Sequence, residues 1–177
     1  MSAGDDVIIT LGENTQLQAV IEAGANPFVI TWTNASSLSD ATVNAPIASP
    51  TSTVLYTITV RDTIAGCHAS DDVLVSIDKK RNIYVPTIFT PNGDGINDFF
   101  TVYGGLDVLR IRKFMVFDRL GEMLYEAKDF DPNDSRKGWD GKLREETMNT
   151  SVFVYYLEVE FKDGAVEDFK GDVTVVK

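Results

Sequence analysis

The segment TPNGDGIND, residues 90–98, gathers polar side chains of the type that bind a hard cation. Four carboxylate or amide side chains surround its two glycines: Asn92, Asp94, Asn97 and Asp98. Calcium takes about six to eight oxygen ligands from such loops, and glycine allows the sharp bend. One interpretation is therefore a calcium site, with Asn92, Asp94 and Asp98 as side-chain ligands and Asn97 as a further candidate.

The ligand spacing matches an EF-hand loop only in part. Asn92, Asp94 and Asp98 take the third, fifth and ninth positions of that loop, but its first and twelfth positions are Thr90 and Thr101. The carboxylates that open and close the EF-hand cage are therefore missing. The alternative is a set of Asx turns, in which the same side chains accept hydrogen bonds from nearby backbone N–H groups. The sequence leaves both interpretations open.

Trp139, in the segment GWDGK at 138–142, is a second candidate site residue. An exposed indole would provide a stacking platform for a sugar or a protein partner. A buried indole would cover the edge of a β-sandwich, with Asp140 and Gly141 in a tight turn. The structural interpretation is favoured because buried aromatic side chains dominate the energetics of small domains. Trp139 is nevertheless kept among the candidate contacts for a partner.

The residue pattern does not favour an enzyme. Cys67 and His68 are the only cysteine and histidine. They are adjacent, and neighbours along a strand or turn usually point apart, so a catalytic pair is not expected. Two such ligands are too few for a zinc site, and a serine triad lacks a credible histidine. The sequence therefore predicts a protein without catalytic activity.

Charge and composition argue against other classes of function. The 177-residue chain has a net charge of −11, most of it before residue 79, and no basic stripe. It is therefore predicted to bind neither nucleic acid nor anionic lipid by charge. Its apolar runs are too short for a membrane-spanning helix. The opening residues, MSAGDD, lack the pattern of a signal peptide, and we expect the chain to be a fragment of a longer protein.

The candidate residues must be positioned by β-strands. In the first half, alternating apolar residues predict strands near 5–11, 15–23, 27–33, 53–62 and 69–78. Their spacing, with Trp32 on a central strand, is typical of an immunoglobulin-like sandwich. The polar cluster DKKRN marks a boundary. It predicts a first domain at 5–78, a linker at 79–82 and a second domain at 83–177.

The second half predicts two hairpins. The segment 114–125 turns at Asp-Arg-Leu-Gly, which suits a type I turn. The segment 155–169 turns at Asp163-Gly164, a strong hairpin pattern. The predicted fold class is therefore all-β, with two consecutive antiparallel β-sandwiches.

The second half resembles the gliding motility-associated C-terminal domain, the type B sorting domain of the type IX secretion system of Bacteroidota. The matching pieces, in the family's order, are VPTIFTPNGDGINDFF (85–100), IRKFMVFDRLGEMLYEA (111–127), GWDGK (138–142), SVFVYYLEV (151–159) and FKGDVTVVK (169–177). Two departures are Leu120, where the family usually has an aromatic residue, and Thr150-Ser151, where it has a glycine. Neither departure removes a strand.

This resemblance implies an address for export across the outer membrane to the cell surface or the medium. The implied partners are the type IX translocon and an outer-membrane protein of the PorP/SprF type. Physically, a folded sandwich would be recognised through its surface or an edge strand. The favoured contact is the last strand, and its removal at 171–177 is expected to abolish export while the first domain still folds. The candidate contact residues are Phe169, Lys170, Gly171, Val173, Val175 and Lys177, together with Trp139.

The first half resembles the PKD-like or immunoglobulin-like repeats of bacterial surface adhesins. The residues that carry this looser resemblance are ITWTN at 30–34 and the segment 51–77. It implies a spacer or an adhesive repeat. The predicted function is therefore the export signal and preceding repeat of a secreted cell-surface adhesin. The alternative is a pair of calcium-dependent carbohydrate-binding or adhesive modules. Neither interpretation fixes the oligomeric state.

Overall fold

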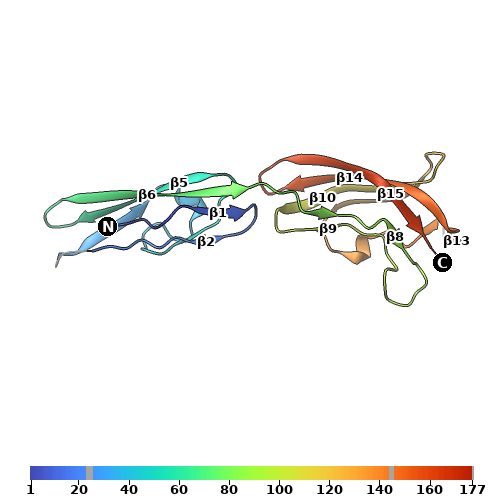
Figure 1. The fold of residues 1–177 in the computed structure, drawn as a ribbon, viewed down its shortest axis with the longest axis horizontal. Helices are drawn as coiled ribbons and strands as arrows, with labels where there is room; N and C mark the ends of the chain where they lie inside the picture. Colours follow the sequence, from blue (N-terminus) through green and yellow to red (C-terminus); the bar gives the residue numbers. More distant parts are fainter. Residues whose placement is uncertain (23–25, 144–145, 177) are drawn as a thin grey trace. The chain divides into compact units, whose positions relative to one another are not determined.

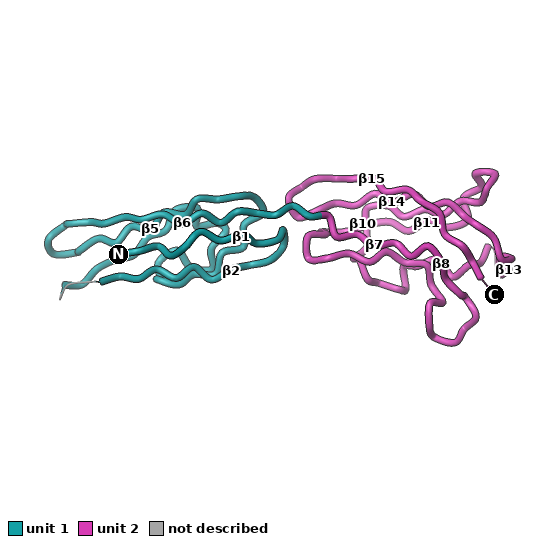
Figure 2. Tube along the Cα trace, in the orientation of Figure 1, with its two compact units in different colours: residues 1–80 teal, residues 81–177 magenta. Residues whose placement is uncertain are grey.

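The computed structural model describes residues 1–177 except 23–25, 144–145 and 177. Throughout these described ranges the chain is built from β-strands and short 3-10 turns, without an α-helix. It divides into two compact units, residues 1–80 and 81–177 (Figure 2). The predicted all-β fold is confirmed. The residues of the predicted linker are shared between the units, because Lys79 and Lys80 belong to unit 1 and Arg81 and Asn82 to unit 2.

Unit 1 is formed by a four-stranded sheet and a separate two-stranded ribbon. The sheet has the order β1-β6-β5-β3, in which β1 runs parallel to β6 and the other pairs are antiparallel. The elements of unit 1 are β1 (Val7–Thr10), β2 (Thr15–Gln16), β3 (Phe28–Trp32), η1 (Ala35–Ser37), β4 (Ile47–Ala48), β5 (Val54–Asp62) and β6 (His68–Asp78), and β2 pairs with β4 in the ribbon. The strand predicted at 15–23 is shorter than expected. Beyond β2, the Leu17 and Ala19 N–H groups donate to loop carbonyls at Pro46 and Asn44.

The core of unit 1 follows the predicted alternation. Tyr56, Ile58, Val73 and Val75 point inward from β5 and β6 and are buried. Trp32 is buried beside them, as predicted, and its Nε1 donates a hydrogen bond to the Val43 carbonyl at 2.8 Å. The indole is therefore both packed and satisfied.

Unit 2 is built around a five-stranded sheet with the order β11-β10-β14-β15-β8 (Figure 1). The pair β15–β8 is parallel and the others are antiparallel. The elements are β7 (Ile83–Tyr84), β8 (Ile88–Phe89), β9 (Tyr103–Gly104), β10 (Val108–Phe117), β11 (Met123–Phe130), η2 (Ser135–Lys137), β12 (Lys142–Leu143), β13 (Glu146–Thr147), β14 (Ser151–Phe161) and β15 (Val166–Val175).

Both predicted hairpins of unit 2 are confirmed. The β10–β11 hairpin turns where Asp118 Oδ1 accepts hydrogen bonds from the N–H groups of Leu120 and Glu122, at 2.9 and 2.8 Å. The β14–β15 hairpin turns at Asp163-Gly164, and Gly164 takes a φ of 83°, a left-handed conformation that favours glycine. The two turns fix the register of the sheet, whose inner face carries most of the core.

Candidate functional site

The loop at 90–98 is a turn held by its own side chains, and it projects from unit 2 after β8 (Figure 1). The Asp98 carboxylate accepts hydrogen bonds from the N–H groups of Gly93 and Gly95, at 2.6 and 2.7 Å. Asp94 Oδ1 accepts the N–H of Ile96 at 2.8 Å, and Asn92 Oδ1 that of Asp94 at 3.0 Å. These are Asx turns, in which polar side chains replace missing backbone partners.

Hydrogen bonds from the Gly93 and Gly95 N–H groups hold the pKa of Asp98 below its usual value. Such bonds favour the ionised carboxylate, so the loop is most stable when Asp98 is charged. Ile96, which lies between these polar residues, is 67% exposed. The loop therefore presents an apolar side chain on a backbone that is already ordered.

The oxygens that a calcium site would need are used inside this loop. Asn92, Asp94 and Asp98 accept backbone N–H groups, and Asn97 contributes a left-handed turn residue with a φ of 54°. Across the residues that the structure describes, no three His, Cys, Asp or Glu side chains form a group that could hold a metal ion. Calcium binding therefore remains a prediction from the sequence, whereas the Asx turns are directly visible.

Trp139 lies inside unit 2 and does not form a surface platform. Its exposed fraction is 1%, its Nε1 donates to the Lys142 carbonyl at 2.8 Å, and its ring contacts Phe89 and Phe153 at centroid distances of 5.6 and 5.0 Å. Its inclusion among the partner contacts was therefore wrong. A buried indole cannot meet a partner while the domain remains folded.

The family-like pieces of the sequence pack against one another. Phe100 exchanges backbone hydrogen bonds with Trp139, and its ring stacks on Phe89 at 5.8 Å. A Cβ added at Gly141 would lie 2.7 Å from Pro91 Cγ, so these two pieces approach too closely for a larger residue. The segments 85–100 and 138–142 are thus two parts of one packed core.

The last strand, β15, is not free along its whole length. At its end Thr174 and Val175 are paired with β8, while β14 occupies the other side. Val173 and Val175 have 0% exposure because they point into the core. Their prediction as contact residues was therefore wrong, and Lys177 lies outside the described residues. Removal of 171–177 would delete part of the core together with any contact surface.

The remaining candidates on β15 are nearer the solvent. Lys170 is exposed, whereas Phe169 and Gly171 are half-buried. A Cβ at Gly171 would lie 2.7 Å from the hydroxyl of Tyr155, which is opposite it on β14. Tyr155 therefore covers the glycine, an arrangement that supports a glycine in an edge strand.

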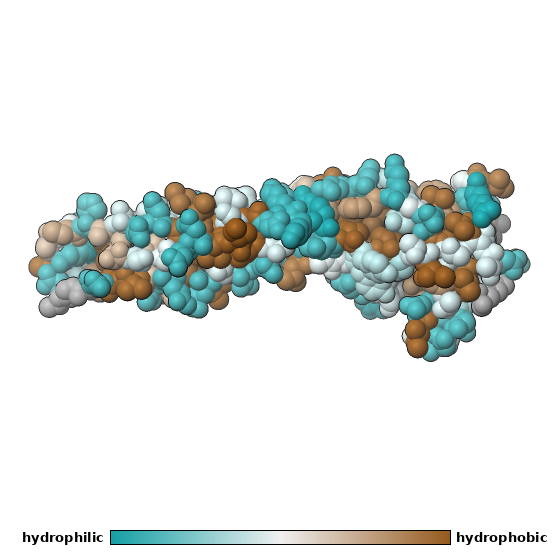
Figure 3. All heavy atoms as spheres, in the orientation of Figure 1, coloured by the Kyte–Doolittle hydropathy of each residue, from teal (hydrophilic) through white to brown (hydrophobic). Residues whose placement is uncertain are grey.

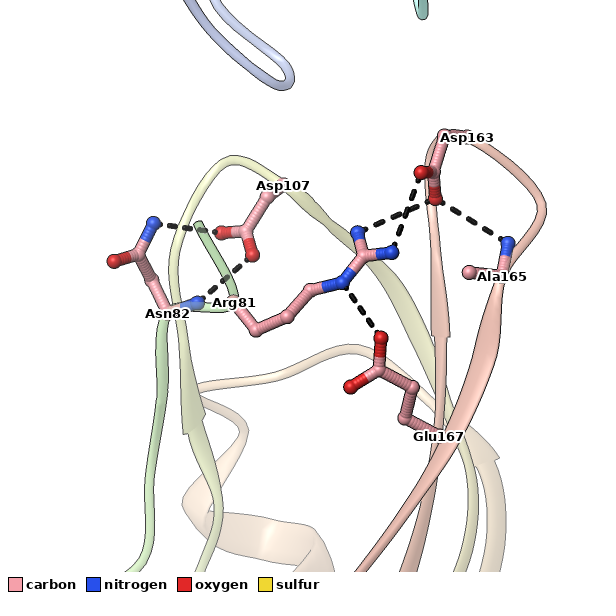
Figure 4. A network of polar contacts seen from close by, with 6 residues as sticks. All are labelled: Arg81, Asn82, Asp107, Asp163, Ala165 and Glu167. Atoms are coloured by element: carbon pink, nitrogen blue, oxygen red, sulfur yellow. Dashed lines mark hydrogen bonds and ion pairs between the residues drawn. The ribbon is translucent and has the colours of Figure 1, made fainter. Parts of the chain in front are cut away.

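A polar network at the start of unit 2 joins Arg81 to the β14–β15 hairpin (Figure 4). The guanidinium contacts both oxygens of Asp163 at 3.3 Å and the Glu167 carboxylate at 2.8 Å, and it lies 4.2 Å from the Phe161 ring centroid. Burial lowers the pKa of Arg81, but the hydrogen bonds and charges of both carboxylates outweigh it, so the net shift is upward. The ion pairs thus hold a partly buried cation.

A neighbouring contact fixes the next residue along the chain (Figure 4). The buried Asp107 carboxylate accepts hydrogen bonds from the N–H and the Nδ2 of Asn82, at 2.9 and 3.3 Å. The N–H of Gly105 donates to the Asn82 carbonyl at 2.9 Å. Sequence reasoning missed this network because DKKRN has the composition of a solvated linker. The only available hint was that Arg is better suited than Lys to forked contacts with carboxylates.

The profile of the CHU_C Type IX secretion signal domain matches residues 83–175. This chain belongs to that family. The match covers nearly all of unit 2, and the resemblance inferred from the sequence motifs is confirmed. A comparison with curated proteins gives no match.

Several solved structures resemble the chain at low sequence identity. A titin A168–A169 structure is 9% identical and covers 98% of this chain and 95% of its own, with a TM-score of 0.34. A titin I67–I69 fragment is 12% identical, with coverages of 97% and 62% and a TM-score of 0.35. Dimeric latent PorU from Porphyromonas gingivalis is 10% identical, with coverages of 97% and 19% and a TM-score of 0.34. This chain thus spans about a fifth of PorU.

CHU_C membership identifies a type IX export signal, which implies that the chain is exported. In the described part of the chain, no helix has the length and apolarity needed to cross a membrane.

Proposed function

We propose that unit 2 is read by the export machinery in its folded state, and that it carries unit 1 to the cell surface as part of a secreted adhesin without catalytic activity. The proposed partners are the type IX translocon and an outer-membrane protein of the PorP/SprF type. Unit 1 serves as a spacer or an adhesive repeat. The observation that carries the proposal is the CHU_C match over a segment that forms one compact unit.

Recognition of the folded state is supported by the burial of the family-like residues. Phe100 and Trp139 have exposed fractions of 0% and 1%, and Val173 and Val175 are also inside. These side chains can influence a partner only through the shape that they maintain. Export should therefore depend on an intact core as well as on a contact surface.

The projecting loop is the proposed contact for the outer-membrane partner. Its backbone is fixed by Asp94 and Asp98, so binding costs little ordering entropy. Its exposed Ile96 suits an apolar pocket. On the face drawn in Figure 3, the surface of unit 2 is otherwise a mixture of small apolar patches and hydrophilic residues.

The test is a delivery assay in a bacterium with a functional type IX system. Fluorescent protein fused ahead of residues 81–177 should reach the cell surface, and the same fusion to residues 1–80 should not. Deletion of the PorP/SprF-type partner should abolish delivery of the first fusion. Equal delivery of both fusions would contradict the assignment of the signal to unit 2.

Two variants separate folding from recognition. Val173→Asp puts a charge in the core and should abolish both folding and delivery, whereas Ile96→Asp should keep the circular dichroism spectrum and reduce delivery. Leu120→Asp is the matched surface control, since Leu120 is 94% exposed on another turn. Normal delivery of unfolded V173D would show that the machinery reads a linear sequence. Normal delivery of I96D would remove the loop from the contact.

A further inference from the structure

Asparagine precedes glycine once in the sequence, at Asn92-Gly93 in the projecting loop (Figure 1). In such a pair the backbone nitrogen of the second residue readily attacks the side-chain amide of the first, because glycine has no Cβ to block the approach. Both residues are exposed, and a Cβ added at Gly93 would meet no atom within 4 Å. Neither burial nor crowding therefore protects this pair.

The reaction open to the pair is deamidation through a succinimide ring. The Gly93 nitrogen attacks Cγ of Asn92, so that a new N–C bond forms and the Cγ–Nδ2 bond breaks. Nδ2 leaves as ammonia and takes the proton that Gly93 has lost. Water then opens the ring at either carbonyl, which gives aspartate or isoaspartate at position 92. Because the ring nitrogen carries no hydrogen, any hydrogen bond that the Gly93 N–H donates must first be broken.

In the folded loop, this nitrogen is held by Asp98. The Gly93 N–H donates to Asp98 Oδ1 at 2.6 Å. Loss of the Gly93 proton would place a negative nitrogen beside the negative carboxylate, and a neighbouring like charge disfavours ionisation. A hydrogen bond to an ionised acceptor is also stronger than one between neutral groups. The carboxylate thus keeps the attacking nitrogen protonated and turned away from Asn92.

The same carboxylate holds a second reactive pair of the loop. Aspartate before glycine forms the same ring with loss of water, and Asp94-Gly95 is such a pair. The Gly95 N–H donates to Asp98 Oδ2 at 2.7 Å. The two oxygens of Asp98 therefore hold the attacking nitrogens of both pairs.

The amide group of Asn92 is also held, at both of its atoms. Its Oδ1 accepts the N–H of Asp94, and its Nδ2 donates to Asp94 Oδ2, each at 3.0 Å. The second of these bonds is lost when Nδ2 leaves as ammonia. The folded loop thus stabilises the unreacted asparagine through both partners of the reaction.

We propose that Asn92 is a modification site that Asp98 protects, and that Asn92 deamidates when the Asp98 carboxylate leaves the Gly93 N–H. The change is irreversible and adds a negative charge. Isoaspartate also lengthens the backbone by one atom, so the turn that joins residues 92 and 94 is lost and Ile96 loses its fixed backbone. A chain whose loop has opened is thereby permanently altered. An effect on export would rest on the proposed function of Ile96, whereas the deamidation does not.

The test follows deamidation of the full 177-residue chain at mildly alkaline pH, by mass spectrometry of the proteolytic peptide that contains Asn92. A synthetic peptide of residues 88–100 gives the rate without the fold. The native chain should react at least about tenfold more slowly than this peptide, and Asp98→Ala should raise the native rate by about tenfold, as expected for one lost charged hydrogen bond. Asp98→Asn, which keeps the shape but not the charge, should react at an intermediate rate.

Two controls separate the Asp98 contact from general loosening. Asp94→Ala frees Nδ2 of Asn92 but leaves Gly93 on Asp98, so its rate should rise less than that of D98A. Asp118→Ala removes a carboxylate that accepts two N–H groups in the β10–β11 turn and should leave the rate unchanged. Circular dichroism verifies that every variant is folded. A native chain that reacts as fast as the peptide would overturn the proposal. So would a D98A rate equal to the native rate, or equal acceleration in D94A and D98A.

Discussion

Unit 1 and unit 2 are both β-sandwiches in which most strand pairs are antiparallel, but their cores differ in composition. Among the described residues, Trp32 and Tyr56 are the buried aromatic side chains of unit 1, and aliphatic residues fill the rest. The core of unit 2 contains a connected set of aromatic rings contributed by distant segments: Phe89, Phe100, Phe114, Phe130, Trp139 and Phe153. Aliphatic side chains can fill similar volumes in many combinations, whereas interlocked rings require particular residues at particular places.

This difference explains why the second half of the sequence is recognisable and the first half is less so. The pieces VPTIF, NDFF, GWDGK and SVFVYY each contribute a ring or a close backbone approach to the same core. The family-like pattern of unit 2 thus describes how the domain folds. Ile96, the proposed contact in the 90–98 loop, lies between VPTIF and NDFF and is exposed.

The largest expected effect comes from removing the buried Trp139 ring. Trp139→Ala should lower the free energy of unfolding of unit 2 by about 3–5 kcal/mol, because it leaves a cavity among Phe89, Phe100 and Phe153. Guanidinium unfolding followed by circular dichroism measures the loss. Trp32 then remains as the fluorescent reporter for unit 1, whose transition should not move.

Trp32→Ala is the reciprocal control, and it should shift the transition of unit 1 while Trp139 fluorescence reports an unchanged unit 2. A W139A chain with an unaltered unit 2 transition would show that its aromatic contacts contribute little. A loss in both units would show that the two cores are energetically linked.

The second effect concerns where unit 2 begins. Arg81→Ala should lower its unfolding free energy by about 2 kcal/mol, since Asp163, whose side chain is 6% exposed, loses a charged partner. The Glu167 side chain is partly exposed, so its ion pair with Arg81 contributes less to this stability. Chemical denaturation of residues 81–177 measures the change. R81K keeps the charge but loses the two-pronged guanidinium contact, so its free energy of unfolding should lie between those of R81A and the native domain. If R81A and the native domain unfold at the same denaturant concentration, the domain begins at residue 83, where the family match starts.

A third effect tests the contact between Gly171 on β15 and Tyr155 on β14. Gly171→Ala should cost about 1–3 kcal/mol, because its Cβ would overlap the Tyr155 ring. Adding Tyr155→Phe removes the hydroxyl that is closest to that Cβ and should recover part of the loss. Denaturation of Y155F alone is the control. A stable G171A domain would mean that the Tyr155 ring moves aside easily and that the glycine is dispensable.

The sequence predicted β1, β3, β5 and β6, both hairpins and the burial of Trp32, because these depend on local alternation and turn residues. It did not predict which side of β15 is covered, since Val173 and Val175 alternate with polar residues as any half-exposed strand would. That assignment depends on the core against which the inner face of β15 packs: Val173 lies opposite Phe153 on β14, whose ring contacts Trp139 from a distant segment. Arg81 was missed for a similar reason. Its carboxylate partners come from the distant β14–β15 hairpin, and composition alone does not identify such contacts.

The smallest effect concerns the loop that the aromatic core supports. The hydrogen bonds of Gly93 and Gly95 lower the pKa of Asp98, so the ionised carboxylate stabilises the folded loop at neutral pH. This contribution is present above the ordinary carboxyl range, about pH 4, and is lost as the pH falls through the lower folded-state pKa. Asp98→Asn removes the charge and cannot accept both N–H groups equally well. The stability of D98N should therefore be slightly lower at pH 7 and should depend less on pH than that of the native chain.

Urea unfolding at about pH 7 and pH 3, with amide hydrogen exchange at Gly93 and Gly95, measures this difference. Asp118→Asn is the matched loss of a carboxylate that accepts backbone N–H groups in the β10–β11 turn, and it should leave exchange at 90–98 unchanged. The native chain and D98N together also test the calcium prediction. If the Asx turns are the whole role of the loop, millimolar calcium leaves the melting temperature of both chains unchanged. If calcium raises the melting temperature of the native chain but not that of D98N, the Asp98 carboxylate turns from the backbone to bind the ion. A ligand that binds the folded state stabilises that state.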